Sequence, residues 1–105
     1  MPQPLRLIIV DDESFMRDNL AHLFPWEELG YELAGACKNG KEALEFIRQN
    51  PVDLLLTDIC MPFMDGMELS RQVYTDFPQI HIVIFSGYNE FEYAKNAMKY
   101  RVEEY

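Results

Sequence analysis

Acidic side chains follow two apolar segments of this sequence, each long enough to form a buried strand. Asp58 ends the run that begins at Leu54, and Asp11 and Asp12 follow the run at residues 7–10. If the two strands lie side by side and point the same way, these three carboxylates meet at one edge of a sheet. Carboxylates that close raise one another's pKa values unless a cation holds them. The pattern therefore predicts a Mg²⁺ site, since Mg²⁺ prefers a few carboxylate ligands and water.

Within such a site, Asp58 is the residue best placed to do chemistry. A carboxylate beside a divalent ion can act as a nucleophile toward a phosphoryl group and form an aspartyl phosphate. Ser86 and Gly87 end another apolar run. A hydroxyl group there could donate a hydrogen bond to a phosphoryl oxygen, and the glycine would let the backbone approach closely.

Acidic residues after strands can also serve simply as helix caps. Asp12 or Ser14 could cap the helix that follows them, and the spacing of Asp65 to Glu68 favours capping as the role of Asp65. We nevertheless favour a shared site for Asp11, Asp12, Asp58 and Ser86. Their joint occurrence at three strand ends is harder to explain by capping than any one of them alone.

The elements that would position these residues alternate along the chain. We expect strands at residues 5–10, 31–37, 54–57, 80–85 and 102–105. We expect a helix bearing Met16, Leu20 and Leu23 that ends by Pro25, and further helices at residues 40–49, 67–75 and 90–100. Cap-like pairs precede three of the helices: Asn39 with Glu42, Asp65 with Glu68, and Asn89 with Glu92.

This alternation predicts an α/β fold with a doubly wound parallel sheet and helices on both faces. In such sheets the working site lies beyond the carboxyl ends of the strands. Both acidic clusters fall at such ends, so the predicted fold and the predicted chemistry agree.

Composition limits the function further. The 105 residues suffice for one domain, and nine basic against 18 acidic residues give a formal charge of −9. A chain this acidic should not bind nucleic acid. It has no signal segment and no apolar stretch near the ~18 residues that span a bilayer. Cys37 and Cys60 lack a CxxC spacing and are expected to be reduced thiols, as in a cytoplasmic protein.

With these residues in view, the chain resembles the receiver domain of two-component response regulators. Three segments carry the resemblance: residues 8–13, residues 58–66 and residues 84–87. The resemblance implies a flavodoxin-like fold with strand order 2-1-3-4-5. It also implies a cytoplasmic signalling domain, not an enzyme, that a histidine kinase phosphorylates and whose own chemistry is only self-directed phosphorylation and dephosphorylation.

The same resemblance assigns roles to individual residues. Asp58 matches the phosphoacceptor, and Asp11 and Asp12 match the metal-binding pair. The backbone carbonyl of Cys60 would complete the Mg²⁺ site with Asp58. Ser86 matches the switch hydroxyl, and Tyr105 matches the aromatic residue that turns inward on activation.

Two further segments, residues 25–30 and 86–94, resemble receivers attached to AraC-type helix-turn-helix transcription regulators. DNA would then be bound by a domain that this chain does not contain. One departure from the family is Phe63, which stands where a small residue, often glycine, is usual. We expect its ring to widen the apolar cover of the loop.

The other departure is the end of the sequence at Tyr105, before the family's lysine, the fifth helix and most of the fifth strand. We therefore expect residues 1–105 to be an incomplete receiver domain whose phosphorylation is slow or undetectable. The fourth strand should become an outer strand of the sheet. Such an edge would make the monomer unstable or let it associate, with the fourth helix and the sheet edge as the surfaces of a possible homodimer.

Two other functions on the same fold are weaker alternatives. An aspartate-nucleophile phosphatase would carry an Asp-x-Asp pattern, whereas Asp58 is followed by Ile59 and Cys60. A flavin- or nucleotide-binding module would need a loop rich in Gly or Ser/Thr after the first strand. The acidic residues found there would repel phosphate unless a metal intervened.

Overall fold

The computed structural model describes residues 3–85 and 102–104, and the strands in these ranges form one parallel sheet. The strands are β1 (Leu5–Val10), β2 (Tyr31–Cys37), β3 (Leu54–Asp58), β4 (His81–Phe85) and β5 (Val102–Glu104). The helices are α1 (Ser14–Leu23), α2 (Gly40–Gln49) and α3 (Gly66–Asp76). The sheet has the order β2-β1-β3-β4-β5, which confirms the predicted fold class and strand order.

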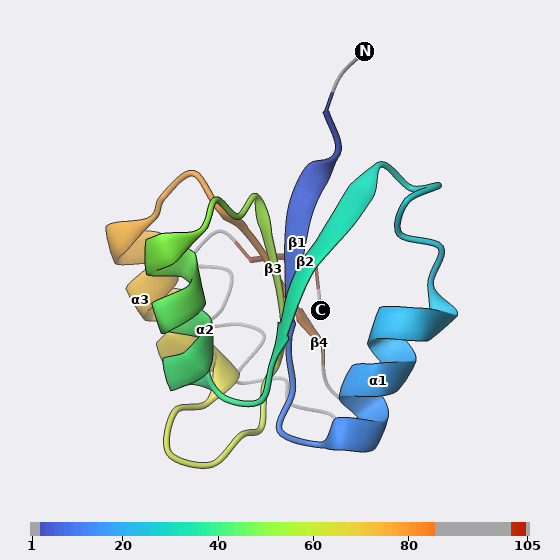
Figure 1. Cartoon of the computed structure of the whole chain (residues 1–105). Helices are drawn as coiled ribbons and strands as arrows, with labels where there is room; N and C mark the ends of the chain where they lie inside the picture. Colours follow the sequence, from blue (N-terminus) through green and yellow to red (C-terminus); the bar gives the residue numbers. More distant parts are fainter. Residues whose placement is uncertain (1–2, 86–101, 105) are drawn as a thin grey trace.

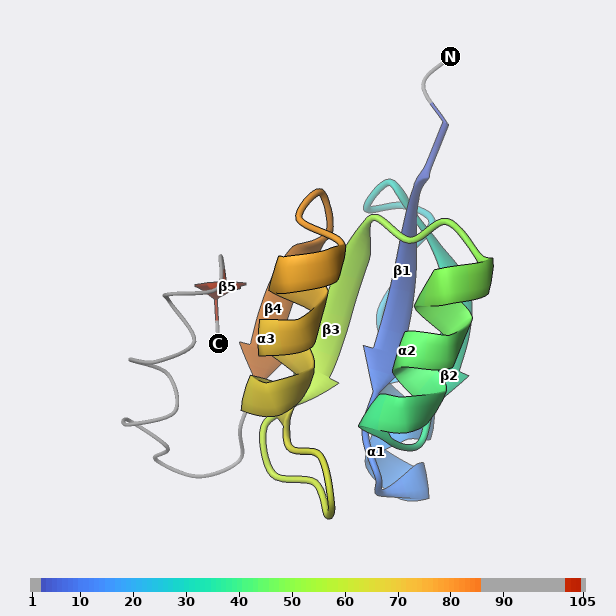
Figure 2. The ribbon, with the colours of Figure 1, turned by 90° about the vertical axis from the view of Figure 1, so that its left-hand side faces the viewer.

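Helices cover both faces of the sheet. Figure 1 views the sheet along its edge, with α1 on one side and α2 and α3 on the other. Figure 2 views it from the side of α2 and α3, and the arrowheads of β1, β3 and β4 point toward the same lower edge. The loops from β1 to α1 and from β3 to α3 therefore leave the sheet at one edge, where the acidic residues were expected.

The core is formed by the apolar runs of the inner strands. In β1, Leu7, Ile8, Ile9 and Val10 are all fully buried, as expected of a strand that is covered on both faces. Alternate residues of β3 and β4 and the inner faces of α2 and α3 complete this core. α1 contributes no fully buried residue. No described helix is long and apolar enough to cross a membrane.

Two of the three predicted helix caps are confirmed. The Asn39 side chain accepts a hydrogen bond from the Glu42 N–H, and the Asp65 side chain accepts one from the Glu68 N–H, each at 2.8 Å. The reciprocal bond of a true capping box is absent from both, because Glu42 accepts from the Lys38 N–H and Glu68 pairs with an arginine. The predicted pair of Asn89 and Glu92, with its helix at 90–100, lies outside the described residues.

The expectation that the fourth strand would be an outer strand is wrong. β5 pairs with it in parallel, with Ile82 opposite Val102 and Val83 opposite Glu104. The ladder is short and irregular, with a register shift between Ile82 and Val83, but it places a strand beside β4. Among the described strands, β2 and β5 are therefore the outer ones.

Phe63, in the loop between β3 and α3, has an unusual backbone conformation. Its φ of 69° lies in the left-handed region, and its side chain is fully exposed, at 109% of the reference area. The expectation that its ring covers the loop is wrong, because a ring this exposed covers nothing. A Cβ atom in this conformation meets the following carbonyl group, which costs about 1–2 kcal/mol. This cost accounts for the preference for glycine at a position of this kind.

We predict that Phe63→Gly raises the free energy of unfolding by about 1 kcal/mol, because it removes the Cβ strain and loses no packing. Phe63→Ala is the matched control, since it removes the ring and keeps the Cβ atom. Urea titration of the three proteins would measure the difference. An equal gain for glycine and alanine would show that the ring, and not the backbone strain, is the source.

Candidate functional site

Strand register brings the predicted carboxylates together. In the pairing of β1 with β3, Val10 lies opposite Thr57, so the residues that follow, Asp11 and Asp58, leave neighbouring strands at the same level. Carboxylate oxygens of Asp11, Asp12 and Asp58 lie within 4.8 Å of one another. The acidic cluster expected from the sequence is thus present at the carboxyl edge of the sheet.

The cluster lines an open cavity of about 420 Å³. Its other lining residues come from the start of α1 and from the ends of β3 and β4: Glu13, Met16, Cys60 and Phe85. Carboxylates form one part of the wall, and apolar side chains and a thiol form the rest. A cavity of this size and polarity can admit a hydrated divalent ion together with a phosphoryl group.

The electrostatics of the cavity favour a bound cation. Burial, and then the nearby charge of Asp11, raise the pKa of Asp58 to about 6, although the backbone N–H groups of Cys60 and Ile59 oppose the shift. Burial also raises the pKa of Asp11, whose side chain is only 2% exposed. A divalent ion would relieve the desolvation and the repulsion together.

Arg17 and Glu13 hold the Asp11 end of the cluster. The Arg17 guanidinium donates a hydrogen bond of 2.8 Å to the backbone carbonyl of Asp11, and its charge lowers the Asp11 pKa only in part. One Asp11 carboxylate oxygen accepts the Glu13 N–H at 2.9 Å. The sequence reasoning missed both contacts, although Arg17 lies one helical turn into α1, a position from which a side chain can reach back.

The alternative that Asp12 or Ser14 caps α1 is wrong. Glu13 occupies the cap position, and no side chain makes a capping hydrogen bond there. Asp12 is exposed and directed into the cluster. Capping therefore does not explain this residue, whereas it does explain Asp65.

Gly66 holds the Asp58 end of the cluster. Its N–H donates to the Ile59 carbonyl at 2.8 Å, which closes the loop between β3 and α3 against the end of the strand. A Cβ atom on Gly66 would lie 2.3 Å from the Asp58 carbonyl oxygen, closer than any contact that a real Cβ atom makes. Thr57 adds a hydrogen bond from its hydroxyl to the same carbonyl at 2.9 Å. The only sequence signal for Gly66 was its place directly after the Asp65 cap.

Of the remaining predicted site residues, the structure describes only Cys60. Cys60 is exposed and lines the cavity, while the role of its carbonyl as a metal ligand stays a prediction. Ser86 and Tyr105 lie outside the described residues. Ser86 follows Phe85 in sequence, and Phe85 pairs with Asp58 in the sheet.

A five-stranded parallel sheet of this order, with three clustered carboxylates at its carboxyl edge, defines the class of the protein as a doubly wound α/β protein with an acidic site beyond its strand ends. Its family follows from comparison with known proteins. The family model of the response regulator receiver domain matches residues 7–105. The chain belongs to this family and is the receiver domain of a two-component response regulator.

Similar proteins agree with this assignment. The chain is 42% identical over 100 residues to an uncharacterized transcriptional regulatory protein, YesN of Bacillus subtilis, covering 95% of this chain and 27% of YesN. It is 32% identical over 100 residues to HptR, a transcriptional regulatory protein of Staphylococcus aureus, covering 95% of this chain and 39% of HptR. The chain thus spans about a quarter to two fifths of the length of these relatives.

Solved structures share the fold as well. The receiver domain of AraT, a response regulator from Geobacillus stearothermophilus, superposes with a TM-score of 0.88 at 34% identity, covering 96% of this chain and 78% of that one. A two-component transcriptional regulator AraC from Clostridium phytofermentans gives 0.86 at 36% identity, covering 95% and 78%. The resemblance to AraC-type receivers is therefore confirmed. Receiver domains generally use Mg²⁺ at the acidic site and interact with histidine kinases.

We predict that Asp58→Asn stabilises the metal-free chain at neutral pH and that this gain disappears in acid. The native-state pKa of about 6 lies above the usual value of 3.8, so the native state loses stability as the pH rises from about 4 to about 6, and the full penalty is present above that range. Below about pH 4 the carboxyl group is protonated in both states. We expect a gain of about 1–2 kcal/mol at pH 7.5, reduced from the full linkage value because the side chain is partly exposed.

Urea titrations at pH 7.5 and pH 4 would measure this difference, with the exposed Asp18→Asn substitution on α1 as a matched loss of one charge. A gain for Asp58→Asn that is the same at both pH values would contradict the electrostatic account of the cluster.

Proposed function

We propose that Asp58 accepts a phosphoryl group from a histidine kinase. The observation that carries this proposal is the meeting of Asp11, Asp12 and Asp58 within 4.8 Å in an open cavity. Asp58 leaves the last position of a central strand, so the sheet holds it in place while its carboxylate faces solvent and a donor. The Mg²⁺ ligands in this proposal are carboxylates of Asp11, Asp12 and Asp58 and the backbone carbonyl of Cys60.

In the proposed reaction, an Asp58 carboxylate oxygen forms a bond to phosphorus while the bond from phosphorus to the kinase histidine breaks. The bound Mg²⁺ would neutralise charge on the phosphoryl oxygens. Asp11 and Asp12 place their carboxylates beside Asp58, where they would share the metal ion with it. Asp58 must be ionised to attack. Its pKa of about 6 in the cation-free site means that protonation competes with Mg²⁺ binding near that pH, so transfer should fall as the pH drops into this range.

The proposed output is a conformational switch. The phosphoryl group adds negative charge at the carboxyl edge, where Ser86 would donate a hydrogen bond and Tyr105 would reorient. The names of YesN and HptR include transcriptional regulation, and we propose that this switch serves the same end through a DNA-binding domain. The chain would then be a cytoplasmic signalling domain whose only chemistry is on its own Asp58.

The two alternative functions on this fold account for the site less well than phosphoryl acceptance by Asp58. A phosphatase of the Asp-x-Asp type would need a carboxylate at position 60, where the chain has Cys60. A nucleotide- or flavin-binding module would place phosphate at the start of α1, where Asp11, Asp12 and Glu13 gather negative charge.

We predict that incubation with acetyl phosphate and Mg²⁺ attaches one phosphoryl group to the chain. Slow labelling is expected, so borohydride reduction would trap the aspartyl phosphate, and peptide mass analysis would locate the modified residue at position 58. Removal of Mg²⁺ with a chelator should abolish the label. Asp58→Asn should also abolish it, because an amide is not a nucleophile toward phosphorus.

Asp65→Asn is the matched control, because Asn at the cap of α3 can accept the same hydrogen bond and should leave labelling intact. A label that survives Asp58→Asn, or that is independent of Mg²⁺, would refute the assignment.

A further inference from the structure

The outer strand β2 has a free edge. It pairs with β1 over its whole length and with no other described strand. Figure 1 shows β2 at the front of the sheet, with α1 on one side of it and α2 on the other. An outer strand offers unpaired backbone groups to any extended segment that can approach it.

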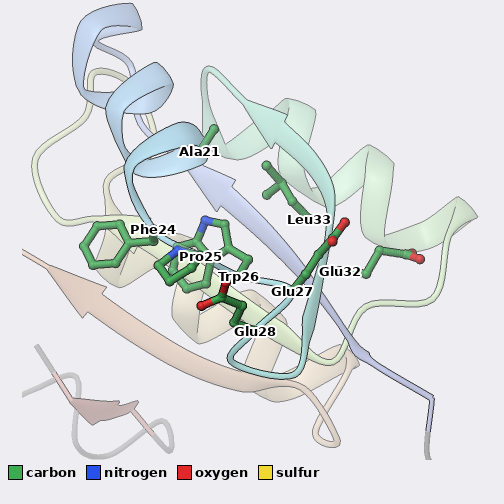
Figure 3. A pocket seen from close by; sticks show the side chains of 8 residues that line it. All are labelled: Ala21, Phe24, Pro25, Trp26, Glu27, Glu28, Glu32 and Leu33. Atoms are coloured by element: carbon green, nitrogen blue, oxygen red, sulfur yellow. The ribbon is translucent and has the colours of Figure 1, made fainter.

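On the α1 side, a cavity of about 400 Å³ lies beside this edge. Figure 3 shows the rings of Phe24, Pro25 and Trp26 gathered on one side of it, with the side chains of Glu27 and Glu32 on the other. The Phe24 and Trp26 rings stack with their centroids 5.2 Å apart. This segment includes residues 25–30, which the proposed phosphoryl transfer does not use.

The aromatic wall of this cavity is fixed in place. The indole N–H of Trp26 donates to the Leu20 carbonyl at 2.9 Å, and its ring packs edge-on against Tyr31 with centroids 6.2 Å apart. A rigid aromatic surface beside carboxylates is a favourable site for a guanidinium or ammonium group, because both the ring faces and the carboxylates attract a cation.

Part of the acidic charge here is uncompensated. Glu32 already forms an ion pair with Arg6. The carboxylates of Glu27 and Glu28 form no hydrogen bond or ion pair with any residue in the described part of the chain, and both residues are exposed. The cavity therefore presents two carboxylates that a cation from outside can meet.

A second cavity, of about 300 Å³, lies beside the same edge on the α2 side. Gly35 and Ala36 of β2 form its floor, while Glu42, Glu45 and Phe46 of α2 form a wall. The missing side chain of Gly35 lets the Phe46 ring pack close to the strand, since a Cβ atom there would come within 3.0 Å of the ring. Like the first cavity, it combines an aromatic ring with carboxylates.

We propose that the free edge of β2 binds an extended basic segment of a partner protein by strand addition. Leu33 lines the first cavity and Gly35 the second. The register shift between them, with Leu33 opposite Leu7 and Gly35 opposite Ile8, turns these two residues to opposite faces of the sheet. An unbulged partner strand presents side chains to opposite faces at positions an odd number apart. A partner with cationic side chains at positions i and i+3 would thus place one in each cavity. The edge does not suit a second copy of this chain, because both cavities are acidic and the chain carries a formal charge of −9.

The test uses the acetylated, amidated peptide Thr-Arg-Thr-Val-Arg-Thr, which has arginines at i and i+3. Its matched control is Thr-Arg-Thr-Arg-Val-Thr, with the same composition and both arginines on one face. We expect the first peptide to bind about fivefold more tightly, since one of two charge contacts is lost in the second. Hydrogen exchange should slow at amides of residues 31–37, and N-methylation of alternate peptide amides should abolish the protection.

Paired substitutions locate the binding. Glu28→Gln with Glu45→Gln removes one charge from each cavity and should weaken the first peptide about fivefold. The control is Asp18→Asn with Asp76→Asn, which removes two negative charges from exposed sites on α1 and α3. It should change the affinity for the first peptide less than about twofold.

Three results would overturn the proposal. Equal affinity for the two peptides, or equal weakening by the two double variants, would show general charge attraction. Protection away from β2 would place the binding elsewhere. Self-association of the chain that protects residues 31–37 without peptide would identify a second copy as the occupant.

Discussion

The structure depends on one constraint: two parallel strands end at the same level, and each is followed by aspartate. The register that sets Val10 opposite Thr57 brings Asp11 and Asp58 together, and buried apolar side chains on both faces of β1 fix that register. A slip of one residue would move the charged Arg6 or Asp11 to a level of the sheet that a buried apolar side chain of β1 now occupies. The free energy that holds the core together therefore also holds the carboxylates in a repulsive cluster.

The loops around the cluster are shaped by this arrangement. At the start of α1, the Glu13 N–H donates a hydrogen bond to Asp11, and no side chain caps the helix. The hydrogen bond at this helix start therefore orients a carboxylate of the cluster. Gly66 lets the next loop fold back onto the end of β3. The strained conformation of Phe63 lies in the same loop. One loop lacks a side-chain cap for α1 and the other contains the positive φ of Phe63. The first loop positions Asp11, and the second positions Asp58.

Much of this could be predicted from the sequence because it rests on local patterns. Apolar runs of strand length, cap spacings such as Asn39 to Glu42, and aspartates after strands are all readable in short windows. They sufficed for the doubly wound parallel sheet and for the grouping of Asp11, Asp12 and Asp58, while the strand order came from the resemblance to receiver domains. The close approach of Gly66 to the Asp58 carbonyl and the positive φ of Phe63 could not be predicted in this way. Both depend on how a loop returns to a distant strand end. The strand at residues 102–105 and its place in the order were expected, but the sequence did not show that so short a strand would pair with β4.

The central claim is that the cluster is a cation site whose repulsion a divalent ion relieves. A thermal unfolding series in increasing Mg²⁺ tests it most directly, with Asp12→Ala as the comparison because Asp12 is exposed and its loss should not disturb the core. The account predicts a saturable rise in Tm for the parent chain, equivalent to about 1.4 kcal/mol at ten times the dissociation constant, and a much weaker rise for the variant. A rise of the same size in both proteins, or no rise in either, would contradict it.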